Sequence, residues 1–223
     1  MFTLSPEVLL IRIVVLLIMV SVHEFAHAYA AYLMGDDTAQ RMGRMTLNPF
    51  VNIWWPGFIL GVLGGFAILG AAPVNPYRMR NPRWGSVVAT AAGSFSNLVL
   101  AALFAVPFRL GAMVALGGNV VGGLLLEFLF QMVLLNIGVA ILSLVPLFPL
   151  DGWHITLAVL PPRPAAWWQR YRTESMYVLF GLIILGFIAS RMAAYVSWGR
   201  YLDILGLVVW EPTLRLFHLL TGL

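Results

Sequence analysis

Long apolar runs recur along this chain of 223 residues, and they constrain its fold more than any other feature of the sequence. Hydrophobic residues make up 61% of the chain, charged residues make up 10%, and the mean hydropathy is +0.91. Soluble domains average about 45–50% apolar residues, and a helix needs about 20 apolar residues to cross the hydrocarbon core of a bilayer. Because several runs reach that length, the sequence predicts an all-α polytopic membrane protein.

Polar and helix-breaking residues divide the apolar sequence into about five to six predicted transmembrane segments. Ser5 and Pro6 are typical of the start of a helix, and Gly35 is typical of its end. The expected spans cover about residues 6–34, 84–108, 121–145, 175–196 and 201–220. Glu211 and Pro212 leave open whether the last of these segments crosses the membrane.

We expect these segments to form a single membrane-embedded domain over residues 1–223. Its core is predicted over about residues 6–160, which contain all the motifs described below, and C-terminal spans follow over about residues 175–220. No internal repeat and no appended soluble domain is evident in the sequence.

Residues 46–75 mix apolar residues with prolines, glycines and turn-forming asparagines, all of which disfavour a straight helix. We expect this segment to form a re-entrant strand hairpin. Such a hairpin must be buried in protein or line a water-filled cavity, because lipid-exposed irregular backbone is not tolerated within a bilayer. A poor helical hairpin is the alternative that the sequence leaves open.

A histidine-glutamate motif, H-E-F-A-H at residues 23–27, lies within the first predicted span. On a helix, residues four apart face the same way at about 5–6 Å, so His23 and His27 can share one zinc ion. Glu24 would lie beside the metal, where such a glutamate takes a proton from the attacking water. Ionisable residues inside a span usually mark a functional site. The alternative is a hydrogen-bonded packing cluster.

A third metal ligand is expected, because catalytic zinc sites usually have three protein ligands. The chain has no cysteine, so this ligand must be a histidine or a carboxylate. Asp151 is the best candidate, since Pro146 and Pro149 break the helix and allow a carboxylate to be presented at membrane depth. His154 is the competing ligand. A role as N-cap of the helix that follows is the structural alternative for Asp151.

The charged residues predict membrane topology and no nucleic-acid partner. Thirteen arginines and no lysine are scattered between the apolar segments instead of forming one basic face. If residues 46–75 return to their own side, links 35–45, 77–83 and 161–173 share one membrane face and hold eight arginines. The positive-inside rule places that face in the cytoplasm, with the N-terminus outside and the histidine motif nearer the cytoplasm.

Three motifs in order resemble those of the site-2 protease family of intramembrane zinc metalloproteases, over about residues 10–160. The first is H-E-F-A-H. The second is P-V-N-P-Y-R-M-R-N-P-R-W-G followed by A-G-S-F-S-N at 92–97, and the third is N-I-G-V-A-I-L-S-L-V-P-L-F-P-L-D-G at 136–152. The chain looks like a minimal form of this family without an added sensor domain.

The resemblance implies that His23, His27 and Asp151 bind one zinc ion per chain and that Glu24 is the general base. Asn97 matches an asparagine of the family that is thought to polarise the scissile carbonyl or to hold substrate, an oxyanion-type role. From the sequence alone, Asn97 could equally form a hydrogen bond between helices.

The sequence departs from the usual pattern of the family at three places. Family members often have Pro at the position of Ser94 and Asn at the position of Ser143. They often have His-x-Asp-Pro where this chain has N-I-W-W-P from Asn52. The three predicted metal ligands are intact. The departures affect substrate handling near residues 46–75, where Asn52 is the candidate substrate-binding residue.

Taken together, the motifs predict an intramembrane zinc metalloprotease that hydrolyses a peptide bond in or near the transmembrane segment of a protein substrate, as in regulated intramembrane proteolysis. A prokaryotic plasma membrane is the expected location. Regulation would come from a membrane partner or from homo-oligomerisation. Two alternatives stay open: a membrane metal-ion transporter, and a non-catalytic homologue that binds membrane helices.

Overall fold

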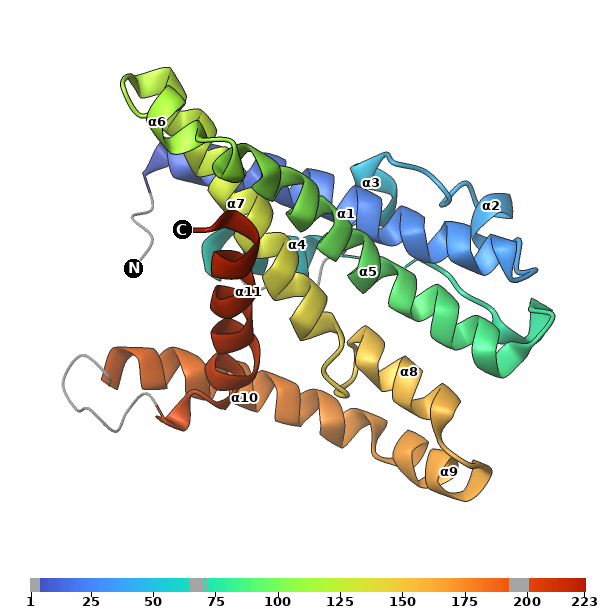
Figure 1. The fold of residues 1–223 in the computed structure, drawn as a ribbon. Coiled ribbons are helices and arrows are strands. Elements are labelled where there is room, and N and C mark those ends of the chain that lie inside the picture. The colour runs from blue at the N-terminus through green and yellow to red at the C-terminus, as the bar shows by residue number, and fades with distance from the viewer. Residues whose placement is uncertain (1–4, 65–69, 71, 193–200) are drawn as a thin grey trace.

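The computed structural model describes residues 5–64, 70, 72–192 and 201–223, and these are mainly helical (Figure 1). Four of the described helices are long and apolar enough to cross a membrane. They are α1 (Pro6–Leu33), α5 (Pro82–Arg109), α7 (Val120–Ser143) and α10 (Arg172–Met192). The predicted all-α polytopic architecture is therefore confirmed, while the number of spans stays a prediction.

Shorter helices connect and extend these four. They are α2 (Thr38–Arg41), α3 (Pro49–Asn52), α4 (Trp55–Gly64), α6 (Ala112–Leu116), α8 (Asp151–Val159), α9 (Pro162–Arg170) and α11 (Glu211–Thr221), with 3₁₀ and π turns at Pro76–Arg78 and Gly206–Trp210. Helix α11 has 11 residues, fewer than the about 20 that a span needs. It stands beside α7 and packs on it (Figure 1).

Helix α1 begins and ends close to where the sequence predicts. Ser5 is its N-cap and accepts a hydrogen bond from the N–H of Val8, and Pro6 occupies the first helical position, where its missing N–H is not needed. After the helix, Gly35 adopts a φ of 107°, a left-handed conformation that glycine takes without a Cβ clash. Local sequence signals therefore define the helix that carries the histidine motif.

The centre of the bundle is formed by α1, α5 and α7. Helices α1 and α5 run side by side (Figure 1), and α5 also packs against α7 and α8. One apolar cluster joins Leu16 and Met19 of α1 to Met132 of α7, and all three side chains are buried. A second cluster joins α5 and α7 to Phe217 of α11. Because both clusters include α7, they hold α1 and α5 in place relative to each other.

The expected strand hairpin over residues 46–75 is wrong for its first arm, which is helical. Asn48 caps α3 by accepting from the N–H of Phe50, and Pro49 follows at the first helical position. Pro56 is the second residue of α4. These prolines start helices instead of breaking them. Among the described residues of this segment, Ile53 and Gly70 form one antiparallel bridge. Residues 65–69 and 71 of the second arm lie outside the described residues.

Candidate metal centre and active site

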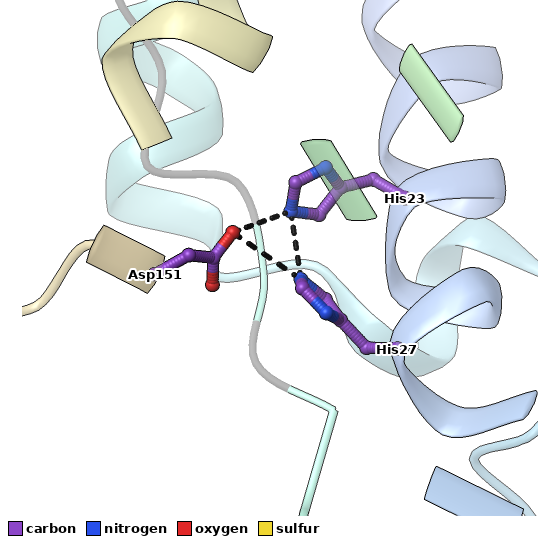
Figure 2. Close-up of side chains that lie close together, drawn as sticks. All are labelled: His23, His27 and Asp151. Carbon is purple, nitrogen blue, oxygen red and sulfur yellow. Dashed lines mark hydrogen bonds and ion pairs between the residues drawn. The ribbon is translucent and has the colours of Figure 1, made fainter. Parts of the chain in front are cut away.

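His23 and His27 project from one face of α1, one turn apart, as the spacing of the motif predicts (Figure 2). Their Nε2 atoms are 2.9 Å apart. Both residues are buried, with 8% and 6% of their surface exposed. Helix α1 therefore presents two imidazole nitrogens to the same point in the interior of the protein.

Asp151 approaches these nitrogens from the opposite side (Figure 2). Its Oδ2 atom lies 3.3 Å from Nε2 of His23 and 3.4 Å from Nε2 of His27. Asp151 is the first residue of α8, and the N-cap position belongs to Leu150. The carboxylate therefore does not cap the helix. It points at the histidines because the chain breaks between α7 and α8 and resumes at Asp151.

The three side chains fit a metal ion. When Nδ1 of a neutral imidazole carries the proton, Nε2 offers only a lone pair, and a carboxylate oxygen likewise only accepts. Oδ2 of Asp151 is buried and has no hydrogen-bond partner among the described residues. The contact of 2.9 Å between the two Nε2 atoms requires a shared proton or a metal cation between them. Two histidines and one carboxylate are a usual ligand set for catalytic zinc, with a fourth position left for water.

His154, the competing ligand, does not join this group. The potential metal-binding group found in the described part of the chain consists of His23, His27 and Asp151 alone. His154 lies one turn further along α8 and lines the same cavity, where its ring packs edge-on against Phe148. The geometry therefore favours Asp151 as the third ligand.

Glu24 lies beside the histidines and is only 3% exposed. Its Oε2 atom accepts a hydrogen bond of 2.6 Å from the backbone N–H of Ala72. Together with His23, His27 and Asp151 it lines a cavity of about 630 Å³, whose walls come from α1, α5, α7, α8 and the chain at residues 70–77. This cavity therefore brings the Glu24 carboxylate next to the three metal-binding atoms and has room for a peptide segment.

The segment that contacts Glu24 is anchored to the loop after α1. The buried carboxylate of Asp36 accepts from the backbone N–H of Asn75 at 2.6 Å. Next to it, Asp37 accepts hydrogen bonds from Arg41 and Arg78. These bonds lower the pKa of the Asp37 carboxyl group, and the bond from Arg41 has the larger effect. The contacts of Asp36 with Asn75 and of Asp37 with Arg78 were not predicted from the sequence, because they join residues about forty positions apart.

Asn97 and Asn52 both lie outside the lining of this cavity. Asn97 of α5 is fully buried at 0% exposure, and its Nδ2 is 3.1 Å from Nδ1 of His23. Asn52 at the end of α3 is also buried and donates from Nδ2 to the carbonyl of Arg44 at 2.9 Å. The structure thus brings Asn97 to a predicted metal ligand and Asn52 to a loop. Their predicted roles towards substrate stay predictions.

Two other positions of α5 contact the histidines and were missed in the sequence. The carbonyl of Ala89 is 2.8 Å from Nδ1 of His27. Gly93 lies so close to both rings that a Cβ there would be 2.4 Å from Nε2 of His27 and 2.8 Å from Cε1 of His23. The one signal in the sequence was Gly93 itself, because a glycine inside an apolar helix can indicate that another part of the protein packs closely against it.

Comparison with known proteins agrees with this geometry. Residues 11–115 match peptidase family M50. The chain is 35% identical over 190 residues to "Putative zinc metalloprotease YwhC" of Bacillus subtilis, and the alignment covers 83% of each protein. The chain belongs to peptidase family M50. A second match, 36% identical over 87 residues, is to "Putative zinc metalloprotease Rip2" of Mycolicibacterium smegmatis and covers 36% of this chain and 33% of that protein. No solved structure matches.

Membership of family M50 confirms the resemblance to the site-2 proteases, and the match includes the histidine motif and the whole of α5. Together with the donor set of His23, His27 and Asp151 it supports the predicted zinc cofactor. The M50 protein described here is therefore a multi-pass membrane protein of a metalloprotease family.

Proposed function

We propose that this chain is a zinc-dependent endopeptidase that cuts a protein substrate in or near its transmembrane segment. One observation carries the proposal: the metal-binding atoms of His23, His27 and Asp151 converge beside the carboxylate of Glu24 on one cavity. The histidines and Glu24 belong to α1, one of the four helices long and apolar enough to span. The relatives named as zinc metalloproteases support the same reaction class.

The chemistry follows from what each side chain can do. A zinc ion bound by His23, His27 and Asp151 supplies the Lewis acidity for attack of water on a peptide carbonyl. The Glu24 carboxylate accepts the proton of the attacking water and returns it to the amine that leaves. The N–H of Ala72, 2.6 Å from Oε2, fixes one oxygen of Glu24 and leaves the other to accept the proton.

A cavity between membrane helices suits a substrate that arrives from the bilayer. The backbone carbonyls of a transmembrane helix are hydrogen-bonded within the helix. The substrate must therefore unwind locally before one peptide bond can reach the catalytic residues. We propose that such a segment occupies the 630 Å³ cavity, and that regulation comes from a membrane partner or from oligomerisation of this chain.

The proposal is tested by coexpression of this chain with single-span substrates and comparison of wild type with Glu24→Gln. Zinc content is measured on the same purified samples. Glu127→Gln is the matched control, because Glu127 lies on α7, outside the cavity lining, and is hydrogen-bonded to Gln131. We expect Glu24→Gln to keep zinc and lose cleavage, while Glu127→Gln keeps both. Cleavage that persists in Glu24→Gln contradicts the mechanism, and wild type that transports zinc into vesicles but cleaves nothing favours the metal-ion transporter.

We also propose that the arginine-rich links face the cytoplasm of a prokaryotic cell and that the N-terminus lies outside. The absence of cysteine makes a direct test simple. Ala166→Cys in α9 and Gly118→Cys between α6 and α7 place single thiols at opposite predicted faces. A membrane-impermeant maleimide added to intact cells should label only Gly118→Cys. Labelling of Ala166→Cys alone would reverse the proposed orientation.

A further inference from the structure

Helix α5 presents a row of three residues to the two histidines of α1. Ala89, Gly93 and Asn97 are spaced four apart, so they follow one another along one face of α5. Ala89 contacts His27, Gly93 lies between the rings, and Asn97 contacts His23. The two helices are therefore antiparallel here, and each Nδ1 atom faces a different group of α5.

The proton on Nδ1 decides whether a histidine can bind the metal through Nε2. A neutral imidazole carries one proton, so Nε2 has a free lone pair only when Nδ1 is protonated. The carbonyl of Ala89 can only accept a hydrogen bond. Its contact of 2.8 Å with Nδ1 of His27 therefore selects the form of His27 that has a free lone pair on Nε2.

Nδ1 of His23 faces the side-chain amide of Asn97. When Nδ2 of Asn97 faces Nδ1 of His23 at 3.1 Å, the amide donates a hydrogen bond and the proton of His23 lies on Nε2. That form cannot bind metal through Nε2. Half a turn of the amide exchanges its oxygen and nitrogen without changing the shape of the side chain. Oδ1 of Asn97, which is buried and has no hydrogen-bond partner among the described residues, then accepts from Nδ1.

We propose that Asn97 is a positioning residue for the metal site: its Oδ1 accepts the Nδ1 proton of His23 and so holds Nε2 of His23 ready to bind zinc. The inference rests on the proposed zinc site and differs from the oxyanion-type role that the family resemblance implies. Asn97 is fully buried and does not line the cavity. It therefore reaches His23 but not a substrate in that cavity.

Zinc affinity separates the two roles. The full chain in lipid nanodiscs is titrated with zinc against a chelator of known affinity, for wild type, Asn97→Ala and Asn97→Asp. We expect Asn97→Ala to weaken zinc binding about 10- to 100-fold, the usual effect of losing a residue that orients a metal ligand. Asn97→Asp has the same size, and its ionised carboxylate can only accept hydrogen bonds, so this variant should bind zinc at least as tightly as wild type.

Asn136→Ala is the matched control. Asn136 is a second fully buried asparagine, on α7, whose Nδ2 donates to the carbonyl of Met132. Its replacement removes a buried amide without touching a predicted ligand. We expect zinc affinity within about twofold of wild type, so that a loss seen only in Asn97→Ala is not a general effect of a cavity or a lost hydrogen bond.

A spectroscopic readout tests the inference without a variant. In zinc-loaded wild type labelled with ¹⁵N-histidine, the His23 ring should show a protonated Nδ1 and a metal-bound Nε2. A metal-bound Nδ1 overturns the inference, as does unchanged zinc affinity in Asn97→Ala or equal weakening in Asn97→Ala and Asn97→Asp. Unchanged affinity with slower cleavage would support the oxyanion-type role instead. A wild type that binds zinc but cleaves nothing refutes the proposed protease activity and leaves this inference standing on the affinity data.

Discussion

Gly93 of α5 lies against His27 of α1 with no room for a side chain between them. A Cβ at Gly93 would be 2.4 Å from Nε2 of His27, whereas heavy atoms in favourable contact are about 3.5–4.0 Å apart. The same Cβ would be 2.8 Å from Cε1 of His23. The absence of a side chain at this one position is thus what allows α5 to pack against both predicted ligands.

Gly93→Ala should therefore remove the metal site. The new methyl group must displace the His27 ring or push α5 away from α1, and either movement separates the ligands. We expect zinc affinity to fall at least about tenfold, measured by competition with a chelator. Gly181→Ala on α10 is the control, because an added Cβ there meets nothing within 4 Å. Wild-type affinity in Gly93→Ala would mean that the two helices are further apart than described.

The identity of the third ligand is tested by comparing Asp151→Asn with His154→Gln. Asp151→Asn keeps the size of the side chain but removes the charge that faces the two imidazoles. We expect it to lose most of its zinc, because three protein ligands are the usual minimum for a catalytic site. His154→Gln should retain a full equivalent of zinc by elemental analysis. The opposite pattern would assign the third ligand to His154.

The parts of the site that depend on local sequence could be predicted. The spacing of His23 and His27 places them on one face of any helix, and prolines near Asp151 indicate a break in the chain. Both features were found as predicted. Local signals failed at residues 46–75, because Pro49 and Pro56 are compatible with a helix start as well as with a break. Only packing against the rest of the protein decides between these two structures.

Contacts between helices could not be predicted, because spacing within one helix says nothing about its register against another. The row formed by Ala89, Gly93 and Asn97 is an example. Another is the hydrogen bond of 2.7 Å between the buried hydroxyl groups of Ser94 and Ser143. Each serine was a separate departure from the family pattern in the sequence. In the structure they are partners, so Ser143 satisfies the buried hydroxyl group that Ser94 introduces where the family often has proline.

Removal of the metal should destabilise the folded protein. A ligand that binds only the folded state adds about 2.7 kcal/mol at a free concentration of 100 times its Kd. Without the ion, the contact of 2.9 Å between Nε2 of His23 and Nε2 of His27 needs a proton in its place. We expect a chelator to lower the Tm of wild type and added zinc to restore it. Asp151→Asn should show little response to either reagent. A chelator-independent Tm in wild type would argue against a bound metal ion.

Arg83 should matter for the metal site through α8, although it lies at the other end of that helix from Asp151. Its guanidinium donates to the carbonyls of Ala158 and Val159, the last of α8, and a cation at a helix C-terminus is worth about 0.3–1 kcal/mol. We expect Arg83→Gln to lower the free energy of unfolding by about that amount and zinc affinity by a few-fold, because α8 loses a contact that holds it on α5. Arg163→Gln on α9 is the control, because it removes an arginine from the same predicted membrane face and so tests the effect of lost charge at that face. If both variants reduced zinc affinity equally, the effect would belong to membrane charge and not to the contact between Arg83 and α8.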